Sequence, residues 1–167
     1  MRTAAAVLTL LGSLLLGAIR QRAIGQRLAC LSCLAADLSR MEAELAGKNA
    51  SLPAIAAMLA EEGEARSFFS RLSAGASSLG ERSFRALWCE AAEAELPALE
   101  ASEREALCAL GAALGRYPLD MQLSALSRCR KTLEEHLLQA RGSLPEDTRL
   151  SWGLSAAGGL LLLILLL

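Results

Sequence analysis

Aromatic side chains are scarce in this chain, in which three Phe, one Tyr and two Trp make up 4% of the residues. A domain with so few rings has to build its core from leucine and alanine, which are good helix formers. No stretch alternates apolar and polar residues with the period of two that is typical of a strand. These absences predict an all-α protein.

The side chains that enzymes use are also few. The single histidine, His136, follows two glutamates on a charged helix, where we expect a solvated position. The sequence contains no glycine-rich phosphate loop, nucleophile elbow or His-Glu metal motif. The formal net charge is −1 and the two signs are interleaved, which argues against nucleic-acid binding. The sequence therefore predicts no enzyme, cofactor, metal or small-molecule substrate.

The five cysteines are an odd number and lack the pattern of a disulfide scaffold, which favours a reducing compartment. Cys30 and Cys33 have Cys-x-x-Cys spacing, so a thiol redox enzyme close to the membrane is an alternative function. That interpretation, like a zinc site, needs a βαβ context or a second ligand pair, and the sequence supplies neither. We interpret both residues as small apolar side chains on a helix.

Two uncharged apolar runs stand at the ends of the chain, at residues 3–19 and 152–167. Each is long enough to cross a hydrocarbon layer of roughly 30 Å at ~1.5 Å per residue. We predict transmembrane helices at 3–19 and 150–167, with a helical domain at 20–149 between them. A secretory signal peptide is the alternative for the first run, but no small-x-small site closes it and arginines follow at once.

Arginines flank the predicted domain on its membrane side, at positions 20, 22 and 27 after the first run and at 141 and 149 before the second. The positive-inside rule therefore places the domain in the cytoplasm. Both membrane segments then leave the same face of the membrane. We expect the first and last long helices to pack antiparallel, with shorter helices at their distal end.

Small residues recur at a spacing of four inside both apolar runs, at Ser13, Gly17, Ser155 and Gly159. This spacing lets two membrane helices approach closely, so we predict transmembrane packing there. An equally weighted alternative is that small residues are simply common in such helices. A purely structural membrane oligomer built on these faces is a further alternative function.

The soluble part of the chain carries helical patterns of apolar residues. From Ile24 to Leu45 the apolar residues recur at spacings of three and four once the pattern is established, with Arg27 as the exception. No glycine or proline interrupts residues 26–46, which predicts that the first apolar run continues as one long helix. Gly142 and Pro145 are expected to interrupt the last helix before the second run. The apolar face of that last helix is predicted to contain Leu119, Leu123, Leu126, Leu133 and Leu137.

Shorter helices are predicted in the middle of the chain. Ser51 and Ser83 are suitable N-caps, because a serine hydroxyl can bond a free amide of the first turn. Ser102 and Glu105 are typical of a capping box. The large side chains that we expect in the core are Phe68, Phe69 and Trp88.

A segment with two glycines, Leu110–Gly115, stands out. Gly111 inside a helix costs ~1 kcal/mol against alanine, which indicates that another helix comes close there. Gly115 fits the left-handed position after a helix, and Pro118 prevents continuation. Gln122 falls in the first turns of the next helix, where its amide can bond the preceding turn. A tight helical turn with no further role is the simplest interpretation of these residues.

Several short elements occur in order along the whole chain: Met41–Leu45, Leu52–Pro53, Phe68–Phe69, Ala86–Trp88, Leu110–Gly115 followed by Gln122, and a Gly-Leu-rich end. Together they resemble the stage III sporulation protein AB family of endospore-forming bacteria. The glycine motif with its glutamine and the terminal run are the distinctive parts of this resemblance.

Two departures from the family pattern are visible. Pro118 stands where members tend to carry an aspartate, and Asp120 follows two positions later, so the resemblance assigns no acidic role at that point. Members also tend to run unbroken from the last soluble helix into the terminal segment, whereas Gly142 and Pro145 intervene here.

The resemblance implies a component of the channel complex between mother cell and forespore. The family is similar to the helical cytoplasmic domain of the type II secretion platform protein, which binds the assembly ATPase. By this analogy of fold we expect a non-enzymatic adaptor in the mother cell membrane around the forespore. Its partners would be lipid, other membrane subunits and the cytoplasmic sporulation ATPase. We assign partner binding to Leu110, Gly111, Leu114, Gly115 and Gln122.

Overall fold

The fold is all-α, as the sequence predicts. A computed structural model describes the backbone of residues 2–48, 50–78 and 82–166 and the side chains of residues 19, 21–47, 50–77 and 82–142. Within this described part, no β-strand is formed.

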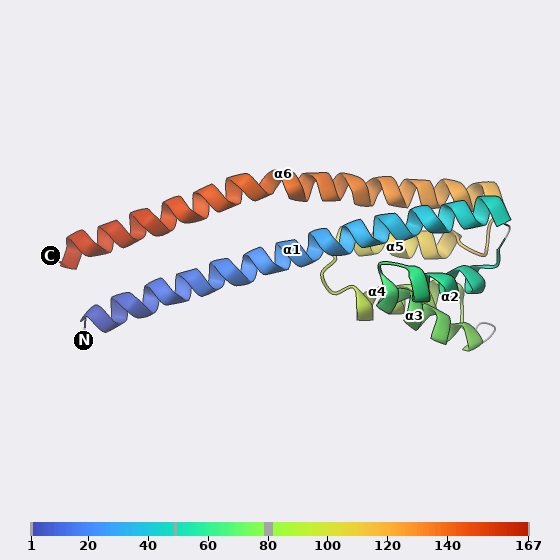
Figure 1. Cartoon of the computed structure of the whole chain (residues 1–167), viewed down its shortest axis with the longest axis horizontal. Helices are drawn as coiled ribbons and strands as arrows, with labels where there is room; N and C mark the ends of the chain where they lie inside the picture. Colours follow the sequence, from blue (N-terminus) through green and yellow to red (C-terminus); the bar gives the residue numbers. More distant parts are fainter. Residues whose placement is uncertain (1, 49, 79–81, 167) are drawn as a thin grey trace. The chain divides into compact units, whose positions relative to one another are not determined.

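In the part of the chain whose backbone is described, six α-helices follow one another (Figure 1). They are α1 (Arg2–Lys48), α2 (Leu52–Glu62), α3 (Arg66–Gly75), α4 (Phe84–Glu95), α5 (Ala101–Ala113) and α6 (Leu119–Leu166), with a 3-10 turn at Ala76–Ser78 after α3. Two compact units result: residues 27–137 form the helical unit, and residues 1–26 with 138–167 form the terminal unit.

The terminal unit contains both segments that the sequence predicts to cross the membrane, 3–19 and 150–167. The backbone of residues 3–19 and 150–166 is helical, and apart from Ile19 the side chains of both segments lie outside the described residues. Among the residues that are described in full, no helix has a stretch long and apolar enough to cross a membrane. The four predicted packing residues also lie outside that set: Ser13, Gly17, Ser155 and Gly159.

The predicted interruption before the second apolar run is wrong. The backbone of α6 is helical through Gly142 and Pro145 to Leu166. A single proline removes only one main-chain hydrogen bond from a helix, and a single glycine lowers helix stability by only ~1 kcal/mol. A helix of 48 residues can absorb both.

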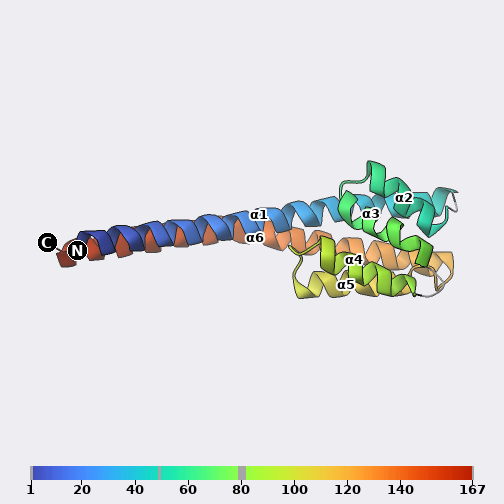
Figure 2. The ribbon, with the colours of Figure 1, turned by 90° about the horizontal axis from the view of Figure 1, so that it is seen from below.

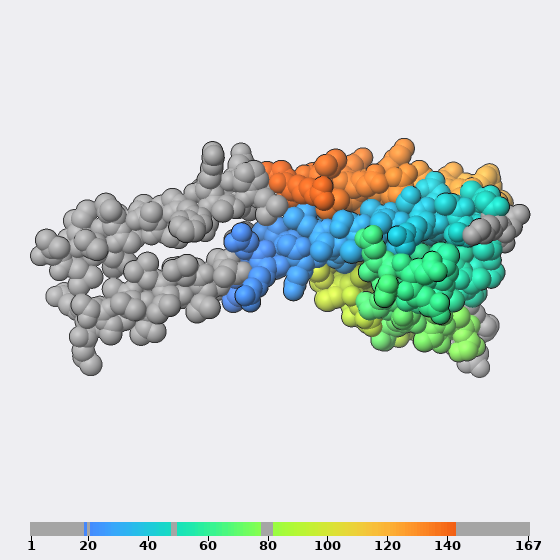
Figure 3. Space-filling view, in the orientation of Figure 1, coloured from blue at the N-terminus to red at the C-terminus, as the bar shows by residue number. Residues whose placement is uncertain are grey.

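In the helical unit, α1 and α6 lie side by side and antiparallel (Figure 3). Glu42 of α1 lies 3.5 Å from Arg130 of α6 at one level. At another level, Arg27 of α1 and His136 of α6 both reach Glu103. The remaining helices pack against this pair, with α3 beginning beside α1 and α5 beside α6.

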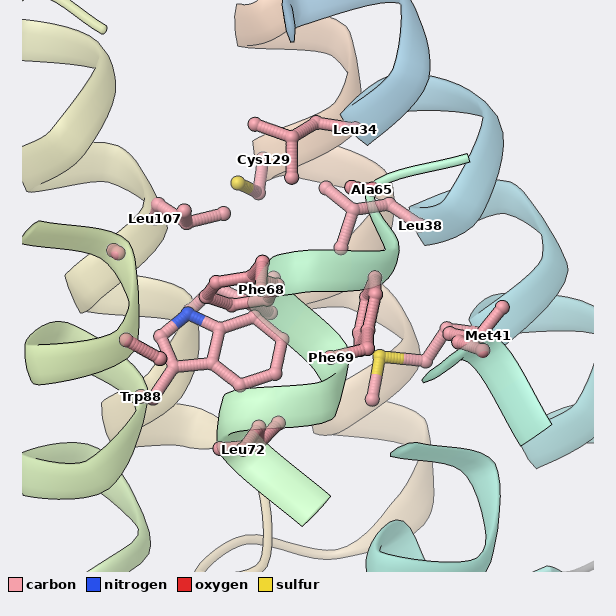
Figure 4. Close-up of a cluster of buried hydrophobic side chains, with 14 of the residues drawn as sticks. Leu34, Leu38, Met41, Ala65, Phe68, Phe69, Leu72, Trp88, Leu107 and Cys129 are labelled. Carbon is pink, nitrogen blue, oxygen red and sulfur yellow. The ribbon is translucent and has the colours of Figure 1, made fainter. Parts of the chain in front are cut away.

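The core of the helical unit is built of leucine around one aromatic cluster (Figure 4). Trp88 of α4 meets Phe68 of α3 edge to face, with ring centroids 4.9 Å apart and an interplanar angle of 88°. Phe69 completes a triangle of rings, with its centroid 4.9 Å from that of Phe68 and 6.3 Å from that of Trp88. These three residues, which the sequence places in the core, are fully buried.

One buried acid supports the core, although the sequence pattern does not indicate it. Asp37 of α1 is fully buried and accepts hydrogen bonds from the backbone N–H groups of Glu64 (3.0 Å) and Ala65 (2.7 Å). It thereby satisfies free amides at the start of α3. A Cβ at Gly63 would lie 2.8 Å from a carboxylate oxygen of Asp37, so only glycine leaves room for this contact.

The predicted helix caps are only partly correct. Ser83 caps α4, and its hydroxyl accepts a hydrogen bond from the Ala86 N–H at 3.2 Å. Ser51 precedes α2 without a side-chain cap bond. The predicted capping box at Ser102 is wrong, because α5 begins two residues earlier than that box requires, with Glu100 as its N-cap and Glu103 as the capping acid.

Candidate partner-binding surface

The helices α4 and α5 lie side by side (Figure 2), and they come into close contact at Gly111. A Cβ on Gly111 would lie 2.6 Å from Cδ1 of Trp88 and 2.9 Å from its Cβ. Real Cβ atoms do not come this close to other atoms, so a glycine is required for the indole to pack on α5. The extra helix expected near Gly111 is therefore α4.

The turn between α5 and α6 is fixed by its backbone and by one amide side chain. Gly115 has a φ of +74°, which glycine adopts without strain. The Gln122 side chain accepts a hydrogen bond from the Gly115 N–H at 3.2 Å and donates one to the Tyr117 carbonyl at 2.7 Å. Gln122 thus bonds the preceding turn, as the sequence suggested.

The five residues assigned to partner binding mostly build this turn. Leu110 and Leu114 are each 2% exposed, and Gly111 is buried as well. These three residues therefore supply no contact area of their own. Gly115 is exposed and Gln122 half-buried. Partner binding by the segment stays a prediction, and any contact has to be made by the side chains that the turn presents.

The turn presents three large apolar side chains to solvent: Tyr117, Leu119 and Met121 are 43%, 40% and 50% exposed. We call these residues the turn surface. The guanidinium of Arg116 lies 6.0 Å from the centroid of the Tyr117 ring. The sequence placed Leu119 on the buried face of the last helix, which is wrong, because Leu119 is the first residue of α6 and the core does not extend over it.

A shallow groove of about 430 Å³ lies between α1 and α6 in the helical unit. Its apolar floor residue, Leu123, follows the turn surface along α6. Glu42 on the α1 side is paired with Arg130 at 3.5 Å. Arg128 and Lys131 make no ion pair with any residue in the described part of the chain. The groove is lined by Glu42, Leu123, Ser124, Ser127, Arg128 and Lys131.

A second polar cluster lies at the other end of α5. Glu103 is fully buried and accepts a hydrogen bond from Nε of Arg27 at 3.0 Å and one from the Glu100 N–H at 2.8 Å. Arg27 also contacts the Glu100 carboxylate. Nδ1 of His136 lies 3.3 Å from Glu103, so the predicted solvated position of His136 is wrong.

The carboxylate of Glu103 is held in its ionised form. Burial by itself raises its pKa, but the hydrogen bonds from Arg27 and from the Glu100 backbone outweigh burial, and the pKa lies below its ordinary value. A carboxylate already bonded to donors from α1, α5 and α6 joins these helices rather than receiving a substrate proton. The ion pair with Glu103 also explains why a charged residue, Arg27, interrupts the apolar pattern of the first helix.

The thiols give the redox alternative no support. Cys30 and Cys33 are unpaired and half-buried, and burial raises the pKa of Cys30 to about 11 and that of Cys33 above its ordinary value. A high pKa keeps a thiol protonated and unreactive. Among the described residues, no group of His, Cys, Asp or Glu could hold a metal ion.

One disulfide is present in the described part of the chain, although the cysteine pattern of the sequence favours a reducing compartment. Cys89 of α4 and Cys108 of α5 are joined, with Cα atoms 5.2 Å apart. Their separation of 19 residues shows no disulfide pattern in the sequence, and only the packing of α4 against α5 brings them together.

A comparison with known protein families identifies the family of the chain. The family model described as stage III sporulation protein AB matches residues 2–167. The chain belongs to this family. Membership assigns it to the stage III sporulation proteins, and the family is not a known enzyme family. No curated protein and no solved structure matches the chain significantly.

Some surface residues described above have weak sequence signals. Tyr117 and Met121 are apolar residues beside Pro118 in a turn, and such residues are more often polar. Arg128 and Lys131 lie on the α6 face opposite the leucine pattern, as ordinary solvated charges do. Their lack of an ion pair within the described part of the chain is visible only in the structure.

Proposed function

We propose that the chain is a non-enzymatic, membrane-anchored adaptor of the channel complex between mother cell and forespore. Its terminal unit anchors it in the mother cell membrane through 3–19 and 150–167, and its helical unit lies in the cytoplasm. The turn surface, with the neighbouring groove, docks the cytoplasmic sporulation ATPase or another channel subunit.

The observation that carries this proposal is the exposed apolar turn surface on a fixed turn. Interfaces draw most of their affinity from a few large side chains, with Tyr and Met among the enriched types. The bonds from Gln122 and the left-handed Gly115 hold these side chains in place before binding, which lowers the entropy cost of docking.

The groove adds charge to this surface. Glu42 is paired with Arg130, while Arg128 and Lys131 make no ion pair in the described part of the chain. An acidic segment of the partner would complement them. Long-range attraction of this kind mainly raises the association rate and depends on salt.

The uncharged runs at the two ends support the membrane anchor, because each is long enough to span a bilayer. Alkaline carbonate extraction of membranes from sporulating cells tests this part of the proposal. The chain should stay in the membrane pellet, and release into the supernatant contradicts the anchor.

Co-purification of the detergent-solubilised full chain with the sporulation ATPase tests the docking surface. Tyr117→Ser combined with Met121→Ser should weaken binding at least about tenfold, since losing two exposed anchors removes more than 1.4 kcal/mol. Arg128→Glu combined with Lys131→Glu should lower affinity and also its dependence on salt.

Arg85→Glu is the matched control, because Arg85 is an exposed arginine on α4 that belongs neither to the turn surface nor to the lining of the groove. It should bind as the parent chain does. Equal binding by all variants, at unchanged melting temperatures, contradicts docking at this surface. Absence of binding by the parent chain itself contradicts the ATPase as partner.

A further inference from the structure

Cys89 and Cys108 lie opposite each other where α4 and α5 pack most closely. Cys89 follows Trp88, and Cys108 lies one helical turn before Gly111. The missing side chain of Gly111 lets the indole sit against α5, and this approach leaves the two cysteine Cα atoms 5.2 Å apart. Natural disulfides usually have Cα atoms 4.4–6.8 Å apart, so the backbone positions of α4 and α5 suit the closed bond.

This pair differs from the other three cysteines because each member has a sulfur partner on the neighbouring helix. Cys129 is buried, and its pKa is raised to about 12 by that burial. Cys30 and Cys33 are unpaired on α1. Cys89 and Cys108 are only half-buried, so a small reagent can reach them from solvent.

We propose that Cys89 and Cys108 are a site of reversible oxidation, at which a low-molecular-weight disulfide of the glutathione type closes a covalent clasp between α4 and α5. One thiolate attacks the reagent, forming a mixed disulfide and releasing one reagent thiolate. The second cysteine attacks the bonded protein sulfur, forming the Cys89–Cys108 bond and releasing the other reagent thiolate. The two protons from the cysteines end on these leaving groups, and the reagent disulfide is reduced to two thiols.

The clasp acts on the hairpin that ends in the turn surface. In a cytoplasm whose thiols are kept reduced the pair is open, and oxidising conditions close it. Closure restricts a loop of 19 residues in the unfolded chain, which stabilises the folded state. It ties α5 to α4 beside the Trp88–Gly111 contact. The inference needs neither the proposed partner nor the proposed membrane side.

The test uses the purified full chain in detergent, incubated with reduced and oxidised glutathione at a series of ratios. Alkylation followed by peptide mass spectrometry should identify one intramolecular bond, between the peptides containing Cys89 and Cys108, with the other three cysteines still alkylated. The oxidised chain should melt about 5–10 °C above the reduced chain. Added dithiothreitol should reverse both changes.

Two double variants separate the clasp from a general effect of oxidation. Cys30→Ser with Cys33→Ser should keep the redox-dependent shift in melting temperature, and Cys89→Ser with Cys108→Ser should lose it. Bonds to cysteines other than Cys89 and Cys108, or no bond at the most oxidising ratio, overturn the proposal. A bond that forms without raising the melting temperature overturns its role as a clasp. Peptide mapping of the parent chain decides the matter even if a variant fails to fold.

Discussion

The two ends of α5 are held in different ways. At the N-terminal end, Glu103 is a buried charge held by Arg27 of α1, with His136 of α6 beside it. At the C-terminal end, Gly111 admits the Trp88 ring, and Gly115 and Gln122 close the turn through backbone contacts. The first end is a junction of charges, and the second is a junction of shape.

This difference shows where a change in chemistry should matter. A junction of charges depends on the protonation state of its carboxylate and fails when one partner is removed. A junction of shape depends on volume and backbone conformation, and it is insensitive to pH. The proposed partner surface extends from the junction of shape, which therefore has to be rigid across a range of conditions.

The largest expected effect is at the junction of shape. Trp88→Ala should lower the free energy of unfolding by about 3–5 kcal/mol, because it empties the space between α3 and α5. Urea unfolding of the full chain, followed by far-UV circular dichroism, measures this change. A melting temperature within a degree or two of the parent would show that the indole does not hold the junction.

The next largest loss of unfolding free energy is expected for Arg27→Ala, at the junction of charges. It leaves Glu103 buried without its main donor, which we expect to cost about 2–3 kcal/mol, less than a fully buried pair because Arg27 is partly exposed. Arg85→Ala, which removes an exposed arginine, is the control and should stay within about 0.5 kcal/mol of the parent. Equal effects of the two substitutions contradict the junction of charges.

Low pH should weaken the N-terminal end of α5, where the junction depends on charge, and not the C-terminal end. The pKa of Glu103 lies below its ordinary value in the folded chain, so its contribution is present above the ordinary pKa of about 4.3 and is lost as pH falls toward the folded pKa. Glu103→Gln should therefore flatten the loss of stability below that pH. If the stability of the parent and that of Glu103→Gln depend on pH in the same way, the charge of Glu103 does not contribute to stability.

Gly111→Ala should lower stability by about 1–3 kcal/mol, because the added Cβ overlaps the Trp88 ring. Gly25 of α1 has no heavy atom within 4 Å of an added Cβ, so Gly25→Ala should instead stabilise the chain by about 0.5–1 kcal/mol. Thermal melts of the two variants give the opposite signs directly. A stabilising Gly111→Ala would mean that helix propensity, and not close packing, decides that position.

The smallest loss of stability among these residues is expected at Gln122. Gln122→Ala removes two hydrogen bonds of a partly exposed side chain and should cost about 1 kcal/mol. It should also weaken partner binding, because the turn surface loses its support. Gln139→Ala, an exposed glutamine on the same helix, should change neither quantity. Equal losses of stability and binding in Gln122→Ala and Gln139→Ala would show that Gln122 has no specific role in the turn.

Residues whose role is local were predictable from the sequence. The left-handed conformation at Gly115 and the cap at Ser83 follow from a few neighbouring residues. The capping box failed because Ser102 fits the motif by itself, whereas Glu103 is drawn toward Arg27 from a helix 76 residues away in the sequence. A local rule has no information about that competitor.

The same reason applies to the remaining corrections. His136 and Leu119 were misassigned because helical spacing gives the face of a residue and not the extent of the neighbouring helix. The Cys89–Cys108 pair has no signal in spacing, since it depends on how far α4 and α5 approach each other.

The sequence by itself determined the helical class, the family and the uncharged runs at both ends, because composition, periodicity and motif order are properties of the chain as written. The tertiary structure decided which charges are buried, which cysteines meet and which apolar side chains are left exposed at the α5–α6 turn. These depend on the distances between helices, and the packing of side chains such as Trp88 against Gly111 sets those distances.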